Sequence, residues 1–206
     1  DKGNTFETIL SALDELGYDV EWQVLNSKNF GVPQNRERVF IIGHLRGECT
    51  GRIFPIGRNT KQAYELPREN ITTNTLTARY GAAQSNGSYI IESEQKKIRI
   101  KEATSQGYAE ATIGDSVNLS HPNSKTRRGR VGKQIANTLL TGESQGVVEP
   151  DFRIRKLTPK ECWRLQGFPD WAFDKAQEVN SNSQLYKQAG NSVTVNVIEA
   201  IAKELK

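Results

Sequence analysis

The two ends of this chain carry regular hydrophobic patterns, and the long stretch between them does not. From Phe6 to Leu16, apolar side chains recur at the i, i+3, i+4 spacing of an amphipathic helix. Two strand-like segments follow, at Asp19–Leu25 and Arg38–His44. From Leu45 to Asp151, Gly, Asn, Ser and Thr are frequent and no helical period persists. We therefore expect an α/β framework at the two ends and a separate lobe of loops and short strands between them.

Capping residues predict where the helices begin and end. Asn4 is placed to cap the first helix, with Glu7 three residues later, and Gly17 is placed to end it. The letters TPKE, which open the segment 158–167, form a capping box with proline at the first helical position. We expect a helix there, a turn at the FPD that follows it, and a closing helix within residues 191–206.

Three short motifs occur in order along the chain. They are PQNRER at Pro33–Arg38, RKLTPKECWRLQGFPD at Arg155–Asp170 and YKQAGNSVTVNVIEAIAKEL at Tyr186–Leu205. In this order they resemble the last three conserved blocks of the DNA (cytosine-5) methyltransferases, and the opening DKGNTFETIL is similar to the segment that follows the Glu-Asn-Val motif of that family. The resemblance is close over residues 1–45 and 153–206, and the stretch between them corresponds only in position, to the variable target recognition domain.

The resemblance implies a fold and a division into parts. The fold class is α/β, with the edge of a Rossmann-like, S-adenosylmethionine-dependent methyltransferase sheet and a smaller, irregular, β-rich target recognition lobe. Residues 1–44 are expected to be the C-terminal portion of the catalytic domain. Residues 45–182 are expected to be the target recognition domain, including an organising helix at 158–167. Residues 183–206 are expected to return to the catalytic domain, so that the first and last parts pack together.

Two arginines, Arg36 and Arg38, directly precede the apolar run Val39–Ile42. Alternate residues of a strand share a face, so both are predicted to point the same way at the entrance to a buried strand. A guanidinium there suits a carbonyl oxygen, a phosphate or a carboxylate, although two exposed charges at a hairpin mouth remain an alternative. The resemblance implies that Arg38 contacts the O2 side of an extruded cytosine, that Arg36 helps to hold the catalytic groups, and that Gln34 anchors the loop.

The letters AGNSV place Gly190 before Asn191 and Ser192, which predicts a turn into the last helix with one of these two residues as its cap. Free N–H groups at such a helix start suit a carboxylate, but the spacing alone favours plain helix capping. The resemblance implies that Asn191, Ser192 and Val193 line the pocket for S-adenosylmethionine.

The segment NSKTRRGRVGKQ, residues 123–134, concentrates positive charge between glycines that make a helix improbable. Flexible cations of this kind suit phosphates and guanine edges in duplex DNA, and a solvated face is the alternative. A net charge of +4 is consistent with a polyanionic partner. The predicted DNA contacts are Lys125, Arg127, Arg128, Arg130, Lys133 and Thr138.

The remaining candidate residues predict no further chemistry. Cys49 and Cys162 form no disulfide framework, and we expect Cys162 to pack inside its helix. His44 and His121 have no partner at metal-ligand spacing, so no metal is expected. No apolar run approaches the ~20 residues that span a bilayer. We expect a monomer in the cytoplasm, of bacterial or phage origin, with no membrane partner.

The resemblance implies methyl transfer from S-adenosylmethionine to C5 of a cytosine that is flipped out of duplex DNA. The family uses a Pro-Cys nucleophile, the Glu of Glu-Asn-Val and a Gly-rich cofactor loop, and none of these occurs in the 206 residues. We expect them upstream of Asp1, on the remaining N-terminal part of the enzyme, and we expect this chain alone to be inactive. Two alternatives stay open: a DNA-recognition subunit of a split methyltransferase, and an RNA cytosine-5 methyltransferase.

Overall fold

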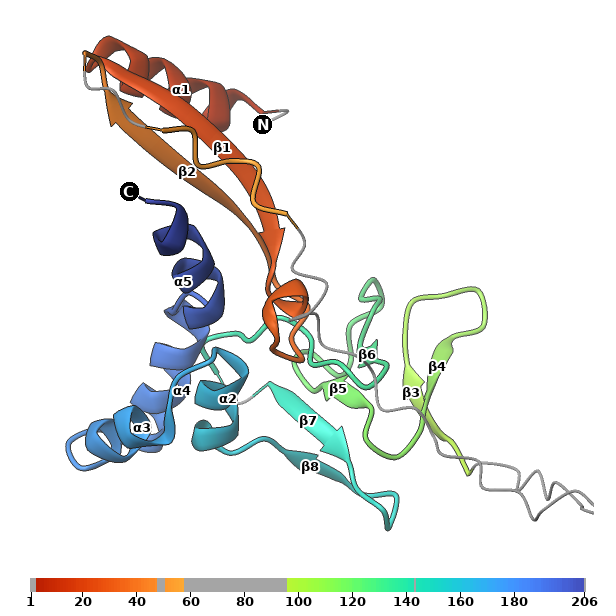
Figure 1. The fold of residues 1–206 in the computed structure, drawn as a ribbon. Coiled ribbons are helices and arrows are strands. Elements are labelled where there is room, and N and C mark those ends of the chain that lie inside the picture. Colours follow the sequence, from red (N-terminus) through yellow and green to blue (C-terminus); the bar gives the residue numbers. More distant parts are fainter. Residues whose placement is uncertain (1–2, 48–50, 58–95, 143, 206) are drawn as a thin grey trace, which may run out of the picture.

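A computed structural model describes residues 3–47, 51–57, 96–142 and 144–205 (Figure 1). The first part contains a helix, two strands and a short 3₁₀ helix: α1 (Asn4–Glu15), β1 (Tyr18–Asn26), η1 (Ser27–Phe30) and β2 (Glu37–Leu45). Six short strands follow: β3 (Ile98–Lys101), β4 (Tyr108–Ala111), β5 (Ser116–Asn118), β6 (Val131–Gly132), β7 (Gln145–Val148) and β8 (Ile154–Lys156). Four helices complete the described residues: α2 (Pro159–Leu165), α3 (Asp170–Gln177), α4 (Asn182–Asn191) and α5 (Val195–Glu204). The fold is mixed α/β.

Helix α1 lies along the β1–β2 pair (Figure 1), and the Phe6 ring meets the Trp22 ring edge-on at 5.1 Å. The predicted cap at Asn4 is wrong. Gly3, in a left-handed conformation with φ 97°, precedes the helix, no side chain caps it, and Asn4 is its first residue. The predicted end at Gly17 is confirmed, because the helix stops at Glu15 and Gly17 has φ 85°, which favours glycine.

Strands β1 and β2 form a two-stranded antiparallel sheet that pairs Tyr18 with Leu45 at one end and Asn26 with Glu37 at the other. The expectation that β2 is a buried strand is wrong for the described residues, because none of its residues is fully buried. One face of the pair, the packed face, carries Leu25, Phe40 and Ile42, which pack in a core with other parts of the chain. The opposite face carries Trp22, which contacts Phe6 of α1, and Val39, which is 49% exposed.

The last helix returns to the first part of the chain, as expected. Its residues Val197 and Ile201 share one hydrophobic core with Leu25 of β1 and with Phe30 of η1. Ile53 and Phe54 complete this core, and Phe40 and Ile42 of β2 pack against it. Helix α5 therefore covers the packed face of the β1–β2 pair, although the two segments lie at opposite ends of the sequence.

The middle of the chain is a small β-rich lobe, which agrees with the short strands expected there. Strands β6, β5, β7 and β8 form an antiparallel sheet in that order, and β3 and β4 form a separate hairpin (Figure 1). Their apolar side chains meet in one core of Ile100, Ala111, Val117 and Val148. The lobe thus has its own hydrophobic interior.

Helix α2 begins as predicted. Thr158 accepts a hydrogen bond from the Glu161 amide, Glu161 accepts one from the Thr158 amide, and proline occupies the first helical turn. The sequence did not predict α3 and α4, where only a turn was expected after α2. Ser181 caps α4 by accepting from the Gln184 amide, a short signal in the polar stretch EVNSNSQ. Burial of apolar residues of α4 against α2 stabilises this part of the chain.

Candidate functional site

Three segments that lie far apart in the sequence meet at a buried polar cluster, which we call the junction. Its members are Ser27, Gln34, Arg36, Gln166 and Thr194, and each is at most 7% exposed. They come from the chain between β1 and β2, from the end of α2 and from the start of α5. All three sequence motifs contribute to the junction, the first through Gln34 and Arg36, the second through Gln166 and the third through Thr194.

Arg36 binds three backbone carbonyls at the junction. Its Nη1 donates to the Leu139 carbonyl at 3.3 Å, and its Nη2 donates to the carbonyls of Gly190 at 3.1 Å and Ser192 at 3.0 Å. Burial, and then the nearby charge of Arg38, lower the pKa of Arg36 from its ordinary value. The side chain therefore ties the lobe and the end of α4 to the first part of the chain.

Gln34 is fully buried beside Arg36. Its Nε2 donates to the Leu165 carbonyl at 3.0 Å, at the end of α2. The backbone around it pairs with the lobe: the Asn35 amide donates to the Ala136 carbonyl at 2.9 Å, and the Ala136 amide donates to the Pro33 carbonyl at 2.8 Å. These contacts give Gln34 a place from which it can anchor the loop.

The sequence did not single out Thr194 or Gln166. The Thr194 hydroxyl donates to Oε1 of Gln166 at 2.9 Å and lies 2.8 Å from the Ser27 hydroxyl, and Nε2 of Gln166 donates to the Ala189 carbonyl at 2.8 Å. Each of the two lies among apolar residues, in RLQGF and SVTVNV. The sequence signal that could have identified them is a polar residue inside an apolar stretch. Such a polar side chain, when buried, is nearly always hydrogen-bonded to a partner.

Arg38 has different surroundings from Arg36. It lies near the start of β2, is exposed, and its Nη1 donates to the Glu37 carbonyl at 2.6 Å. The expectation that both arginines share one strand environment is wrong, because Arg36 precedes β2 and turns into the junction. Arg38 is therefore the more accessible of the two guanidinium groups.

The predicted turn at residues 190–192 is wrong. Helix α4 continues to Asn191, and Ser192 is its C-terminal cap, with its amide donating to the Gln188 carbonyl at 3.0 Å and its hydroxyl to Ala189 at 2.9 Å. Helix α5 begins later, after Thr194. The segment therefore lies between the carbonyl end of α4 and the first turn of α5, and neither Asn191 nor Ser192 caps α5.

Two of the three side chains at this helix end are accessible to a ligand. Asn191 and Val193 are exposed, and they offer an amide and an apolar surface. Ser192 uses its hydroxyl and its carbonyl within the protein. An expected cofactor would therefore meet Asn191 and Val193 directly, while Ser192 shapes the turn.

The basic segment of the lobe divides into buried and exposed members. Arg130 is 6% exposed, and it donates from Nε to the Asn118 carbonyl at 3.0 Å and from Nη1 to the Lys101 carbonyl at 3.1 Å. The expectation that Arg130 faces DNA is therefore contradicted by its burial. Lys125 and Arg128 are exposed and Arg127 is half-buried.

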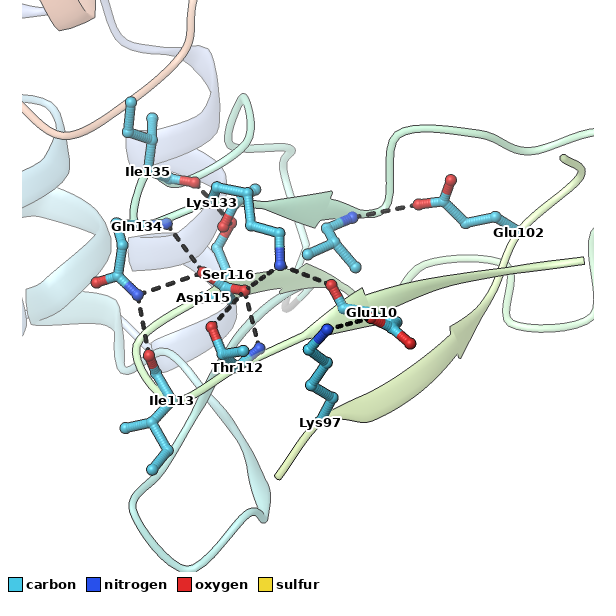
Figure 2. A network of polar contacts seen from close by, with 12 residues as sticks. Lys97, Glu102, Glu110, Thr112, Ile113, Asp115, Ser116, Lys133, Gln134 and Ile135 are labelled. Carbon is cyan, nitrogen blue, oxygen red and sulfur yellow. Dashed lines mark hydrogen bonds and ion pairs between the residues drawn. The ribbon is translucent and has the colours of Figure 1, made fainter. Parts of the chain in front are cut away.

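Lys133 belongs to a polar network centred on the buried carboxylate of Asp115 (Figure 2). Its Nζ donates to Oδ2 of Asp115 at 2.7 Å and to the Glu110 carbonyl at 2.7 Å. Burial alone would raise the pKa of Asp115. Hydrogen bonds from Lys133 and Thr112 lower it by more than burial raises it, so the pKa lies below its ordinary value. The charge of Lys133 is used mainly within the lobe.

Thr138 links the lobe to the loop that carries Gln34 and Arg36. Its hydroxyl donates to the Asn35 carbonyl at 2.8 Å. Close by, a cavity of about 350 Å³ lies between α2 and the lobe sheet, lined by residues that include Pro33, Ser116, Ala136 and Val147. Most of the residues that line it are apolar, and its polar side chains include Gln134, Glu161 and Arg164.

Cys162 of α2 is buried in a hydrophobic core, as expected. Only 4% of it is exposed, and burial, followed by the charge of Glu161, raises its pKa to about 12. Cys49 lies outside the described residues. Within the described ranges, no group of three or more His, Cys, Asp or Glu side chains could hold a metal, and no helix is long and apolar enough to cross a membrane.

Known proteins and a protein family are similar to this chain over its whole length or nearly so. A family model for C-5 cytosine-specific DNA methylases matches residues 1–206. The chain is 33% identical over 203 residues to the type II methyltransferase M2.ScrFI of Lactococcus lactis subsp. cremoris, covering 97% of this chain and 49% of that protein. It is 35% identical over 208 residues to the type II methyltransferase M.SsoII of Shigella sonnei, covering 100% of this chain and 49% of that protein.

A phage protein and a solved structure are more distant. The orphan methyltransferase M.SPBetaI of Bacillus phage SPbeta is 28% identical over 274 residues, covering 98% of this chain and 62% of that protein. A methyltransferase structure from Entamoeba histolytica aligns with a TM-score of 0.43 and 15% identity over 97% of this chain and 57% of that chain, too weakly to bear on function. The chain spans about half the length of the type II methyltransferases it matches.

Proposed function

The chain belongs to the C-5 cytosine-specific DNA methylase family, and from this premise we propose that it is the C-terminal part of an enzyme that methylates C5 of a flipped cytosine in a specific duplex DNA sequence. Two observations support a C-terminal part. The chain covers 49% of two type II relatives. It also lacks the Pro-Cys and Glu-Asn-Val sequences. The nucleophilic cysteine and the catalytic glutamate would then be supplied by a preceding part of the protein.

The junction is the observation that carries this proposal. Arg36 ties the lobe to the framework through the carbonyls of Leu139 and Gly190, and Arg38 stands exposed two residues away. An exposed guanidinium held at a rigid boundary can stabilise negative charge that develops on a base oxygen during attack. We assign Arg38 the contact with the O2 side of the cytosine, and Arg36 and Gln34 the positioning of the surrounding backbone.

S-adenosylmethionine would supply the electrophilic methyl group when bound. Asn191 and Val193 would contact it through their exposed side chains, and Ser192 would set the turn between α4 and α5. The carbonyls of Gly190 and Ser192 are occupied by Arg36. For this reason the segment would recognise the cofactor through side chains rather than through a helix terminus.

The proposed DNA contacts are narrower than the sequence suggested. Lys125, Arg127 and Arg128 remain in the set as cations at the surface of the lobe. Thr138 remains because it lies where the lobe meets the loop of Arg36. Arg130 leaves the set, since its guanidinium is buried. Lys133 also leaves it, because its ammonium group is paired with the buried carboxylate of Asp115.

The β1–β2 pair has exposed apolar side chains that the preceding part of the enzyme would cover. Trp22, Val24 and Val39 are 49%, 51% and 49% exposed. Apolar side chains on one face and unpaired strand edges are features that proteins usually cover. We propose that β1 and β2 extend the Rossmann-like sheet of the catalytic domain through an unpaired strand edge, and that the preceding part of the enzyme covers Val24 and Val39.

The test is methyl transfer by the whole protein that contains this chain, with labelled S-adenosylmethionine and either duplex DNA or transfer RNA. We expect label in cytosines of the duplex, and a loss of kcat of about 100-fold or more when Arg38 is replaced by alanine. The 206-residue chain alone should transfer no label. Label in the RNA but not in the duplex, or transfer by the chain alone, would contradict the proposal.

A further inference from the structure

We propose that one face of the β3–β4 hairpin, which carries Lys97, Arg99 and Lys101, binds DNA phosphates through Arg99 and Lys101, and extends the contact made by the basic loop at residues 125–128. The inference rests on the proposed function, in which duplex DNA is the partner. It adds a surface that the sequence motifs did not indicate, because these three cations lie outside the basic segment. Below, this surface is called the hairpin face.

Strand alternation places the three cations together. Ile98 and Ile100 point into the core of the lobe with Ala111, so the residues between them point outward. Arg99 and Lys101 are exposed. Alternate residues of a strand lie ~6.6 Å apart, and a regular row of cations at this spacing suits the repeating phosphates of a polynucleotide.

Positive charge exceeds negative charge on the hairpin face. Glu110 lies directly across from Arg99 in the strand register, and its Oε2 accepts from Lys97 at 2.8 Å (Figure 2). The hydrogen bond from Lys97, followed by the charges of Lys97, Arg99 and Lys133, lowers the pKa of Glu110. Because Lys97 is paired with Glu110 and Lys133 with Asp115, the excess positive charge of the hairpin face is that of Arg99 and Lys101.

Arg99 is held in place before any ligand arrives. Its guanidinium lies over the Tyr108 ring, 4.6 Å from the ring centroid. Tyr108 itself accepts a hydrogen bond at its hydroxyl from Gln106 at 3.1 Å. A planar guanidinium that is already stacked loses little freedom on binding, so it suits a phosphate oxygen better than a free lysine would.

The hairpin face is continuous with the basic loop. The Ala103 amide donates to the Arg127 carbonyl at 2.8 Å, and Nε of Arg128 donates to the Ala103 carbonyl at 2.8 Å. These bonds attach the basic loop to Ala103, which lies two residues after Lys101. The neighbouring carboxylate of Glu102 is buried and accepts from backbone amides, including that of Arg130 at 2.6 Å, so it faces inward.

Contacts with phosphates are measured by the salt dependence of DNA binding. Each phosphate contact contributes about 0.9 to the slope of log affinity against log salt concentration. In the whole protein, the double variant Arg99→Gln/Lys101→Gln should therefore lower the slope by about 1.8 and weaken binding equally for duplexes of different sequence. The charge-preserving variant Arg99→Lys should keep most of the slope. Fluorescence anisotropy with labelled duplexes gives both quantities.

The matched control replaces two exposed lysines of the C-terminal helices, Lys187→Gln/Lys203→Gln, and should leave the slope unchanged. If the double variant does not fold, as judged by circular dichroism, Lys101→Gln alone should lower the slope by about 0.9. A slope equal to that of the unaltered protein, or a loss confined to one DNA sequence, would overturn the inference. Methyl transfer to duplex DNA by the same unaltered protein would at the same time uphold the proposed function, so the two failures can be told apart.

Discussion

Arg36 and Arg38 carry the same charge and are separated by one residue, yet their side chains have different surroundings in the fold. Arg36 is 7% exposed and donates to three carbonyls, whereas Arg38 is exposed at the start of β2. A guanidinium is suited to the first task because its fixed fork of N–H groups can serve several acceptors at once. The two side chains should therefore differ in what they contribute to the stability of the fold.

Replacement of Arg36 by alanine should lower the free energy of unfolding by about 3–5 kcal/mol, because the carbonyls of Leu139, Gly190 and Ser192 would lose their donor inside the protein. Replacement of Arg38 by alanine should change it by less than about 0.5 kcal/mol. Urea unfolding followed by circular dichroism measures both. Equal effects of the two substitutions would show that Arg36 does not hold the junction.

Cys162 should be inert in the folded protein. Its pKa is raised to about 12, and the thiolate is the reactive form. In a chain that carries Cys49→Ser, alkylation by iodoacetamide at pH 8 should be at least ~100-fold slower than in urea, where the thiol regains an ordinary pKa near 8.5. Rapid labelling under native conditions would contradict the burial of this residue in α2.

Among the secondary-structure elements, β1 holds a non-regular segment against its packed face. The carboxylate of Glu21 accepts from the amides of Ile53 and Phe54, both at 2.8 Å, and from His44 at 2.8 Å. Gln23 exchanges hydrogen bonds with the backbone of Ile56 at 2.8 and 3.1 Å. Two side chains of one strand thus replace the hydrogen bonds of a neighbouring strand.

This segment should loosen in acid. Burial raises the pKa of Glu21, but bonds from His44 and from the two amides lower it below its ordinary value of 4.5. The ionised carboxylate therefore stabilises the fold fully above about pH 4.5. That contribution is lost as the pH falls through the lowered pKa. Hydrogen-exchange protection of the Ile53 and Phe54 amides should decline over that acid range.

The variant Glu21→Gln should show low protection of both amides already at pH 7, because a neutral amide offers one weaker acceptor in place of a carboxylate. Glu15→Gln, an exposed substitution on α1, serves as its control and should preserve protection. If the two amides stay equally protected in Glu21→Gln, the carboxylate is not what holds the segment.

In the molecule as a whole, the lobe meets the C-terminal helices through a close approach of two backbones. A Cβ atom at Gly190 of α4 would lie 2.4 Å from the Leu140 oxygen and 2.7 Å from the Thr141 nitrogen. Glycine at this position therefore lets the lobe come within reach of Arg36, which binds the carbonyls on either side of the contact, those of Leu139 and Gly190.

Gly190→Ala should lower the free energy of unfolding by about 1–3 kcal/mol, even though alanine is the better helix former, because backbone atoms must move apart. The Leu140 and Thr141 amides should also exchange faster in this variant. Gly142→Ala is the control, since a Cβ there meets nothing within 4 Å. A Gly190→Ala protein with unaltered stability would mean that helix and lobe do not touch as described.

Local signals were enough to predict part of this fold. The capping box at Thr158 and Glu161 and the glycine at position 17 were interpreted correctly, because capping acts between residues within a single helical turn. The PQNRER motif, with the two other motifs, also led to the right family. The cap assigned to Asn4 failed because Gly3, in its left-handed conformation, takes over the turn into the helix.

The different surroundings of Arg36 and Arg38, the burial of Arg130 and the place of residues 191–193 after α4 could not be read from spacing. Each depends on acceptors that are distant in the sequence, as when Arg36 reaches Leu139 and Ser192 or Arg130 reaches Asn118. A residue pattern shows that a cation is present, but its role depends on whether the folded chain surrounds it with carbonyls or leaves it in water, and burial without partners is costly. For this protein, the order of the motifs therefore sufficed to identify the family, and only the packed junction distinguished Arg36, which is buried among backbone carbonyls, from Arg38, which is exposed to solvent.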